Sequence, residues 1–306
     1  MLSSFFSKSK PINFIVVALY MFTLYVIAYY KKGFDLEYKS ILMFLGGFIA
    51  YIITMLLVNL ITQKNDLTKK STNTVLLFAF FTALLPTSLT RPDILLANLF
   101  LTLGIICVLD LRNGKQIKSN VFDASLCIGL ASLVYFWSIG FILIVFLGIL
   151  FFEPKNYRNW MIPIISLITI YVLANCFTLL FYDSLFDVTD YVDTVSFTFE
   201  NYMNRESFFP IGSVILCVFF FFSVYLLKFK RKSAKVKPIL KLIIAQLVIA
   251  VLIIVIVPNK NTSEILFITT PLAIIGTTYL EIDHDRLIKE INIWVFLLLP
   301  FMTLLF

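Results

Sequence analysis

Residues 121–152 read VFDASLCIGLASLVYFWSIGFILIVFLGILFF, an almost unbroken apolar run of 32 residues. As one α-helix this run would be about 48 Å long, whereas the hydrocarbon core of a bilayer is about 30 Å thick. A hairpin that turns near Phe136-Trp-Ser-Ile-Gly140 fits this thickness better. We therefore predict that the run crosses a membrane twice rather than once.

Similar apolar runs fill almost the whole chain of 306 residues, of which 60% are hydrophobic and 14% charged, with a mean hydropathy of +0.95. The sequence predicts an all-α polytopic membrane bundle of about eleven helices, which forms one integral membrane domain over residues 1–306. The predicted spans are 12–30, 41–61, 73–87, 94–109, 121–136, 138–152, 160–182, 208–227, 238–257, 264–280 and 291–306.

The distribution of basic residues predicts the orientation of this bundle. If the N-terminus is cytoplasmic, the outer loops hold only six of the 25 lysines and arginines, and the cytoplasmic segments hold the other 19. Such an excess is typical of the cytoplasmic side. With a single helix at 121–152, the basic stretch 228–237 would lie outside. We therefore expect a cytoplasmic N-terminus and a periplasmic C-terminus. The six outer residues are Lys31, Lys32, Lys39, Arg91, Arg205 and Lys260.

The predicted membrane interior contains almost no ionisable side chains. Its deeper polar residues are neutral, as at Asn59, Asn98, Asn175 and Gln246. Ion-coupled transporters need charged groups within the membrane, so this pattern argues against them and leaves a facilitator open. The single histidine and four scattered cysteines predict no metal site of their own. The net charge of +7 is explained by topology, and we expect no nucleic-acid partner.

The first outer loop, residues 31–39, places Asp35 and Glu37 two residues apart directly after the first span. Two carboxylates in this position are suited to binding a divalent cation or to acting as a general base. We take both as candidate catalytic residues. The alternative is a short solvated turn whose acids balance three lysines.

The second outer loop, residues 86–93, contains Arg91, Pro92 and Asp93. Proline suits the first helical turn, and an acidic residue there is stabilised by the helix dipole. Arg91 is a candidate for binding a lipid phosphate at the outer leaflet, and Asp93 is a candidate substrate-binding residue beside it. The alternative is an arginine that only anchors the helix at the interface.

The third outer loop is long, from residue 182 to 207. Its apolar residues recur at steps of three and four, which predicts an amphipathic surface helix near 188–203 that begins at Asp187. The acidic face of this helix suggests that it packs against the bundle and roofs a cavity. Tyr191 and Arg205 are the candidate substrate-binding residues of this loop.

Two resemblances add to this reading. Ser3-Ser-Phe-Phe-Ser-Lys-Ser-Lys-Pro-Ile-Asn-Phe14, the residues 122–136 and Tyr157-Arg-Asn-Trp-Met-Ile-Pro163 resemble a family of polytopic inner-membrane proteins of Bacteroidota. That likeness covers the whole chain and implies a bacterial inner-membrane location, but no activity.

The second resemblance covers residues 73–182. Thr90-Arg-Pro-Asp-Ile-Leu-Leu-Ala-Asn98, Ile128-Gly-Leu-Ala-Ser-Leu-Val-Tyr135 and the basic turn at 155–158 resemble polyprenol-dependent glycosyltransferases with a multi-helix membrane fold. The resemblance implies that Asp35 or Glu37 acts as the outer-face acid and that Arg91 binds the lipid phosphate. Those enzymes carry a long first outer loop, whereas here the loop has about nine residues.

The leading functional hypothesis is an inner-membrane protein that handles a lipid-linked substrate at the outer leaflet, in the manner of a glycosyltransferase with a polyprenyl-phosphate sugar donor. Its expected partners are the lipid bilayer and a lipid-linked sugar. Two alternatives stay open: an accessory subunit that binds other envelope proteins, and a lipid or small-molecule transporter or flippase. A divalent cation is the one cofactor that the acidic first loop would suit.

Overall fold

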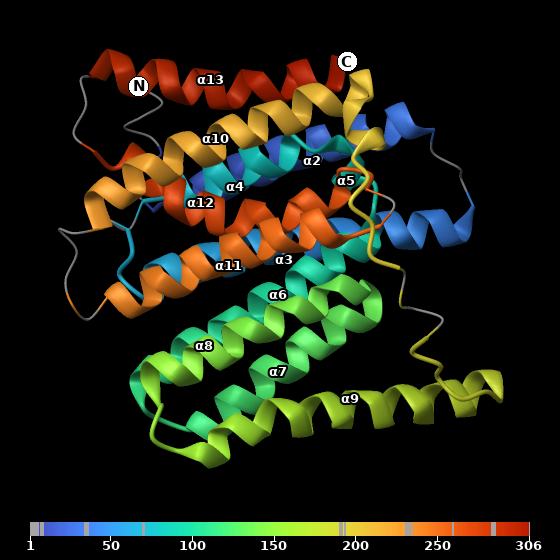
Figure 1. Cartoon of the computed structure of the whole chain (residues 1–306). Helices are drawn as coiled ribbons and strands as arrows, with labels where there is room; N and C mark the ends of the chain where they lie inside the picture. Colours follow the sequence, from blue (N-terminus) through green and yellow to red (C-terminus); the bar gives the residue numbers. More distant parts are fainter. Residues whose placement is uncertain are drawn as a thin grey trace.

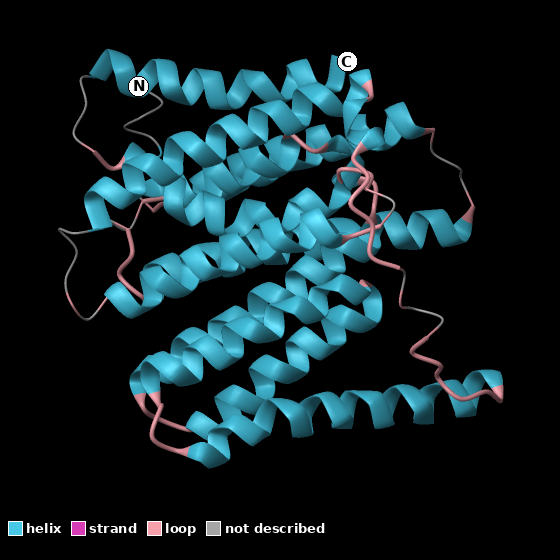
Figure 2. Cartoon of the chain, in the orientation of Figure 1, coloured by secondary structure: helices cyan, strands magenta, loops and turns pink. Residues whose placement is uncertain are grey.

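The computed structural model describes residues 6, 9–33, 37–68, 71–189, 192, 194–229, 234, 236–258, 260–282 and 286–305. These residues form helices joined by loops, with no strand among them, as Figure 2 shows. The α-helices are α2 (Pro11–Lys32), α3 (Tyr38–Lys64), α4 (Asn73–Ala83), α5 (Pro86–Leu89), α6 (Pro92–Asp110), α7 (Ile117–Val134), α8 (Ile142–Phe152), α9 (Tyr157–Tyr182), α10 (Arg205–Phe229), α11 (Lys237–Ile256), α12 (Leu266–Leu280) and α13 (Arg286–Leu305). Short 3-10 helices are η1 (Leu111–Asn113), η2 (Phe136–Phe141), η3 (Glu200–Met203) and η4 (Ser263–Ile265).

The helices confirm the predicted membrane bundle. Within the described chain, eight segments are long and apolar enough to cross a membrane, and three shorter apolar helices cover 73–83, 136–152 and 290–303. Each of the eleven predicted runs overlaps one of these segments. The helices lie roughly parallel or antiparallel to one another (Figure 1).

The predicted hairpin at residues 121–152 is also confirmed. Helix α7 ends at Val134, the 3-10 helix η2 makes the turn, and α8 returns beside α7 from Ile142. The chain turns because no bilayer accommodates an apolar helix of 32 residues without strong tilt or mismatch.

The loops gather at two ends of the bundle, which we name after a residue in each. At the Lys64 end, Lys64 Nζ lies 2.6 Å from Asp110 Oδ1, and Ser71 Oγ donates to Glu281 Oε1 at 3.0 Å. At the Arg91 end, Lys32 Nζ donates to the carbonyl of Thr90 at 3.2 Å. These contacts join loops that the alternating topology places on the same side. Which end faces the cytoplasm stays a prediction.

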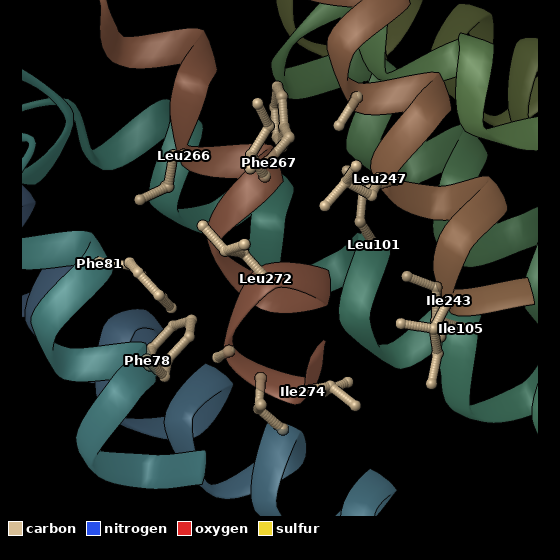
Figure 3. Close-up of a cluster of buried hydrophobic side chains, with 14 of the residues drawn as sticks. Phe78, Phe81, Leu101, Ile105, Ile243, Leu247, Leu266, Phe267, Leu272 and Ile274 are labelled. Carbon is tan, nitrogen blue, oxygen red and sulfur yellow. The ribbon is translucent and has the colours of Figure 1, made fainter. Parts of the chain in front are cut away.

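Helices α4 and α12 form the centre of the bundle. All eleven residues of α4 are buried, as are most of those of α12, and the two helices pack against each other. A helix that is apolar all round is stable only when neighbours cover every side. Figure 3 shows this core, in which α12 lies between side chains of α4 on one side and side chains of α6 and α11 on the other. The labelled residues are Phe78, Phe81, Leu101, Ile105, Ile243, Leu247, Leu266, Phe267, Leu272 and Ile274.

Glycines let several helices approach closely, as is common in membrane bundles. A Cβ atom added at Gly47 of α3 would lie 2.8 Å from the Tyr25 hydroxyl and 3.2 Å from Cβ of Pro92. A Cβ added at Gly148 of α8 would lie 2.5 Å from a methyl carbon of Val108. These positions fix how α2, α3, α6 and α8 pack.

The predicted surface helix at 188–203 is wrong for the residues described. We call the segment 183–204 the strap. Its described residues 183–189, 192 and 194–199 form no helix or strand, and the single turn η3 follows them (Figure 1). It is rich in valine and threonine, which favour helices weakly. Its backbone also bonds to the bundle: Ser196 N donates to the carbonyl of Ile256 at 3.3 Å. A helix would need that group for its own hydrogen bonds.

Candidate functional site

Two loops lock together at the Arg91 end. The corner formed by α5 and the start of α6 faces the segment 260–265, where Thr262 has a φ of 68°. The hydroxyls of Thr87 and Thr262 are 2.5 Å apart, and Ser88 Oγ donates to the carbonyl of Ser263 at 3.2 Å. These contacts hold Arg91 and the 260–264 segment side by side.

Arg91 pairs with Asp93 across the start of α6. Arg91 Nη2 lies 2.6 Å from Asp93 Oδ2, and Nε donates to Oδ1 at 3.0 Å. The Asp93 carboxylate is the main cause of a raised Arg91 pKa, with smaller contributions from Tyr135 and Glu264. Both side chains are about one-third exposed, at 38% and 34%. The guanidinium is therefore fixed in direction but open to a ligand.

Asn261 connects this pair to a buried acid. Its amide is fully satisfied when Oδ1 accepts from Arg91 Nη1 at 3.0 Å and Nδ2 donates to Glu264 Oε2 at 2.9 Å. The backbone N–H of Asn261 also donates to Glu264 Oε1, at 3.2 Å. One residue thus couples the exposed guanidinium to a carboxylate in the interior.

Glu264 is only 1% exposed, although a buried carboxylate is costly unless hydrogen-bonded. Besides Asn261, it accepts a short hydrogen bond from the hydroxyl of Tyr202, which comes from η3 of the strap. Burial raises the pKa of Tyr202, and the charge of Glu264 raises it further. The phenol therefore stays protonated and serves as a donor that fastens the strap to the bundle.

Lys260 fastens the strap at a second point. Its side chain is 2% exposed, and Nζ donates to the carbonyls of Ser196 at 2.6 Å and Val257 at 2.8 Å. The ammonium also lies 4.6 Å from the centre of the Phe199 ring, a cation–π contact. Burial lowers the pKa of Lys260, while the nearby Glu264 carboxylate raises it.

The full sequence was compared with protein-family models, with curated proteins and with solved structures. Residues 1–306 match a family described as a family of unknown function, DUF6427. The chain belongs to this DUF6427 family. Neither the search of curated proteins nor the search of solved structures gives a match.

In this DUF6427 chain, the structure brings together only part of the predicted site. Arg91 and Asp93, both candidate substrate-binding residues, form an ion pair that the sequence analysis did not predict. Glu37 is exposed and precedes α3 without a side-chain bond that caps the helix. Asp35 and Tyr191 lie outside the described residues, and so does the side chain of Arg205, which begins α10.

Sequence reasoning missed the residues that join Arg91 to the strap: Tyr202, Lys260, Asn261 and Glu264. The sequence did contain a signal for Lys260 and Glu264. The two residues carry opposite charges and lie four residues apart before an apolar helix, a spacing at which charges can interact. The bond from Tyr202 to Glu264 spans 62 residues and has no local signature.

The part of the chain that the structure describes contains no group of three or more His, Cys, Asp or Glu side chains suited to a metal. The candidate cation site of the first loop is therefore left to Asp35 and Glu37, only one of which is described. It remains a prediction.

Proposed function

We propose that this chain is a multi-pass protein of a bacterial cytoplasmic membrane that binds the phosphate of a lipid-linked substrate at its Arg91 end. The observation that carries the proposal is the state of the Arg91 guanidinium. A guanidinium has five N–H donors, and in the described part of the chain Asp93 and Asn261 accept three of them. The fixed, one-third-exposed fork suits a phosphate, which arginine binds with paired hydrogen bonds.

A groove at the same end, lined by apolar residues and by a few polar ones such as Ser184 and Asp187, supports a lipid as the ligand. It has a volume of about 560 Å³ and lies between α7, α9 and the start of the strap. Its walls include Leu130 and Leu133 of α7 and Phe177 of α9. Helices α7 and α9 diverge toward this end in Figure 1. Tyr135 follows directly after α7, two residues beyond the groove-lining Leu133.

The activity that fits such a substrate is transfer of its sugar. Asp35 or Glu37 would take the proton from a hydroxyl of the acceptor. The acceptor oxygen would then bond to the anomeric carbon of the sugar while the bond from that carbon to the phosphate oxygen breaks. Polyprenyl phosphate would leave with its negative charge held by Arg91. Glu37 is exposed and lies five residues beyond Lys32, whose ammonium binds the Arg91 corner.

A second candidate function is that of an accessory subunit in an envelope complex. One observation favours it: Arg91, Asp93, Asn261, Glu264 and Tyr202 belong to one hydrogen-bond network. A connected polar network of this kind also suits a rigid scaffold. This candidate requires a protein partner and no affinity for lipid phosphate.

The deciding experiment measures binding of undecaprenyl phosphate to the protein in nanodiscs by native mass spectrometry. Arg91→Ala should weaken binding at least about tenfold, since a hydrogen bond to a charged group contributes about 1.5–3 kcal/mol. The affinity of the Arg91→Lys variant should lie between those of Arg91→Ala and the unmodified protein, because lysine keeps the positive charge but lacks the forked donors of the guanidinium.

Lys39→Ala is the matched control, because Lys39 is an exposed basic residue at the start of α3, near the same end. It should bind like the unmodified protein. Equal binding by the Arg91→Ala variant would remove the lipid-phosphate proposal. Co-purification of a stoichiometric membrane protein would then favour the accessory subunit.

A further inference from the structure

A polar cavity lies between the strap and the turn before η4. Its volume is about 410 Å³, within the range of roughly 300–1,000 Å³ that small-molecule sites occupy. Small-molecule sites are usually lined by apolar residues. Here every lining residue except one proline has a polar side chain. The lining consists of Thr194, Ser196, Thr198, Glu200, Asn201, Pro258 and Lys260.

Two hydrogen bonds to the bundle fix the backbone that lines the cavity. The ammonium of the buried Lys260 donates to the carbonyl of Ser196, and the N–H of Ser196 donates to the carbonyl of Ile256. On the same stretch of the strap, the hydroxyls of Ser196 and Thr198 are 2.8 Å apart. The strap is therefore fixed where it lines the cavity, although it has no regular secondary structure there.

The lining selects the class of ligand. Hydroxyl groups, an amide and a carboxylate offer both donors and acceptors within one small space. The Glu200 carboxylate disfavours a free anion, and the near absence of apolar wall disfavours a hydrocarbon. A ligand with several neutral hydroxyl groups matches this set, because each of its hydroxyls both donates and accepts.

The cavity is also next to the proposed phosphate site. Lys260 lines the cavity, and the next residue, Asn261, contacts Arg91. Lys260 and Asn261 are consecutive, so the cavity and the Arg91 site share one stretch of backbone. A phosphate at Arg91 would therefore carry its attached group toward the strap.

We infer that the cavity bounded by the strap and Lys260 binds the sugar group of the lipid-linked substrate whose phosphate lies at Arg91. The inference rests on the proposed function and adds the location of the sugar. It assigns Glu200 as a residue that selects the sugar by accepting hydrogen bonds from its hydroxyls.

The test compares two affinities for each variant, again in nanodiscs by native mass spectrometry. One probe is undecaprenyl phosphate, and the others are the same lipid carrying glucose, mannose, galactose or N-acetylglucosamine. The unmodified protein should prefer at least one sugar-bearing lipid. Glu200→Gln should reduce that preference about tenfold, as expected for lost hydrogen bonds to a charged acceptor.

Asp183→Asn is the matched control. Asp183 is an exposed acid at the other end of the strap, and asparagine tolerates its positive φ of 51°. The control should keep the preference. Because the readout is a ratio, a variant that fails to fold loses both affinities and is recognised. Thr198→Val, which removes one hydroxyl from the lining, should lower the preference in the same direction.

The outcomes separate the inference from the proposed function. The inference is overturned when none of the four sugar-bearing lipids binds better than the bare lipid, or when Glu200→Gln keeps the full preference. The proposed function would survive either result as long as Arg91→Ala still weakens binding of undecaprenyl phosphate. Conversely, an effect of Glu200→Gln without an effect of Arg91→Ala would keep the sugar site and remove the phosphate site.

Discussion

Lys260 shows how one buried charge organises an irregular segment. A lysine that is 2% exposed needs compensation for lost hydration. Two backbone carbonyls and the face of Phe199 supply it, and Glu264 adds a nearby negative charge. The carbonyl of Ser196 belongs to the strap and that of Val257 to the bundle. The ammonium therefore acts as a tie between the two.

Replacement of Lys260 by methionine should detach the strap. Methionine preserves most of the side-chain volume but leaves the carbonyls of Ser196 and Val257 without their donor. Each unsatisfied buried group costs about 1–3 kcal/mol. We expect a lower melting temperature in detergent and faster proteolytic cleavage within residues 183–204.

The control is Lys39→Met, which changes an exposed lysine at the same end of the bundle. It should leave both the melting temperature and the cleavage rate unchanged. If the Lys260→Met variant resists proteolysis as well as the unmodified protein does, the strap is held by its other contacts, such as the bond from Tyr202 to Glu264.

At the scale of helices, packing depends on positions where no side chain fits. The ring of Tyr25 is fully buried, and its hydroxyl donates to the carbonyl of Phe44 at 3.0 Å. It cannot swing away from Gly47 without breaking that bond. Helix α3 is thereby held close to both α2 and the start of α6.

Gly47→Ala should therefore destabilise the protein, whereas Gly46→Ala should not. Both changes give α3 the same gain in helix propensity. An added Cβ at Gly46 meets no atom within 4 Å, but at Gly47 it clashes with Tyr25 and Pro92. Overpacking of this kind costs about 1–3 kcal/mol. Thermal unfolding of the two variants should differ in this direction, and equal melting temperatures would refute the tight contact.

The helical hairpin could be predicted from the sequence, whereas the conformation of the strap could not. The hairpin follows from local properties, because apolar length and bilayer thickness together require a turn near residue 138. The strap has helical spacing in its apolar residues, yet its described residues before η3 form no helix. Its backbone partners, Ile256 and Lys260, lie about sixty residues away in sequence, where periodicity carries no information.

At the scale of the whole molecule, the two ends of the bundle differ in their polar and charged residues. The Arg91 end holds the buried polar network and the strap, and the Lys64 end holds the loops that carry most of the basic residues. The excess of lysine and arginine predicts that the Lys64 end faces the cytoplasm. The structure groups the loops as the alternating topology requires, and the side of the membrane is open to measurement.

Cysteine labelling measures that side. With the four native cysteines replaced by alanine, single cysteines would be placed at Asp183 and Lys155, which are exposed at opposite ends. A membrane-impermeant maleimide should label only the Asp183→Cys variant in intact spheroplasts. Both variants should react after lysis. Labelling of Lys155→Cys alone in intact cells would reverse the predicted orientation.

The candidate site was only partly predictable for the same reason as the strap. Arg91 and Asp93 are two residues apart, so local helix-start signals placed them together. Glu264 and Tyr202 meet only because η4 and the strap converge at one end. A single sequence carries no information about a contact between segments so far apart.

The central position of α4 has a consequence for how the protein is made. With eleven residues, α4 is about 16 Å long, too short to cross a bilayer by itself. Its partner α12 begins 183 residues after α4 ends, so at 5–20 residues per second it leaves the ribosome roughly ten to forty seconds later. Until then α2 and α3 cover only part of its surface. Biogenesis therefore includes an interval in which the future core is a half-sheltered helix, until the segment from Leu266 onward has been synthesised.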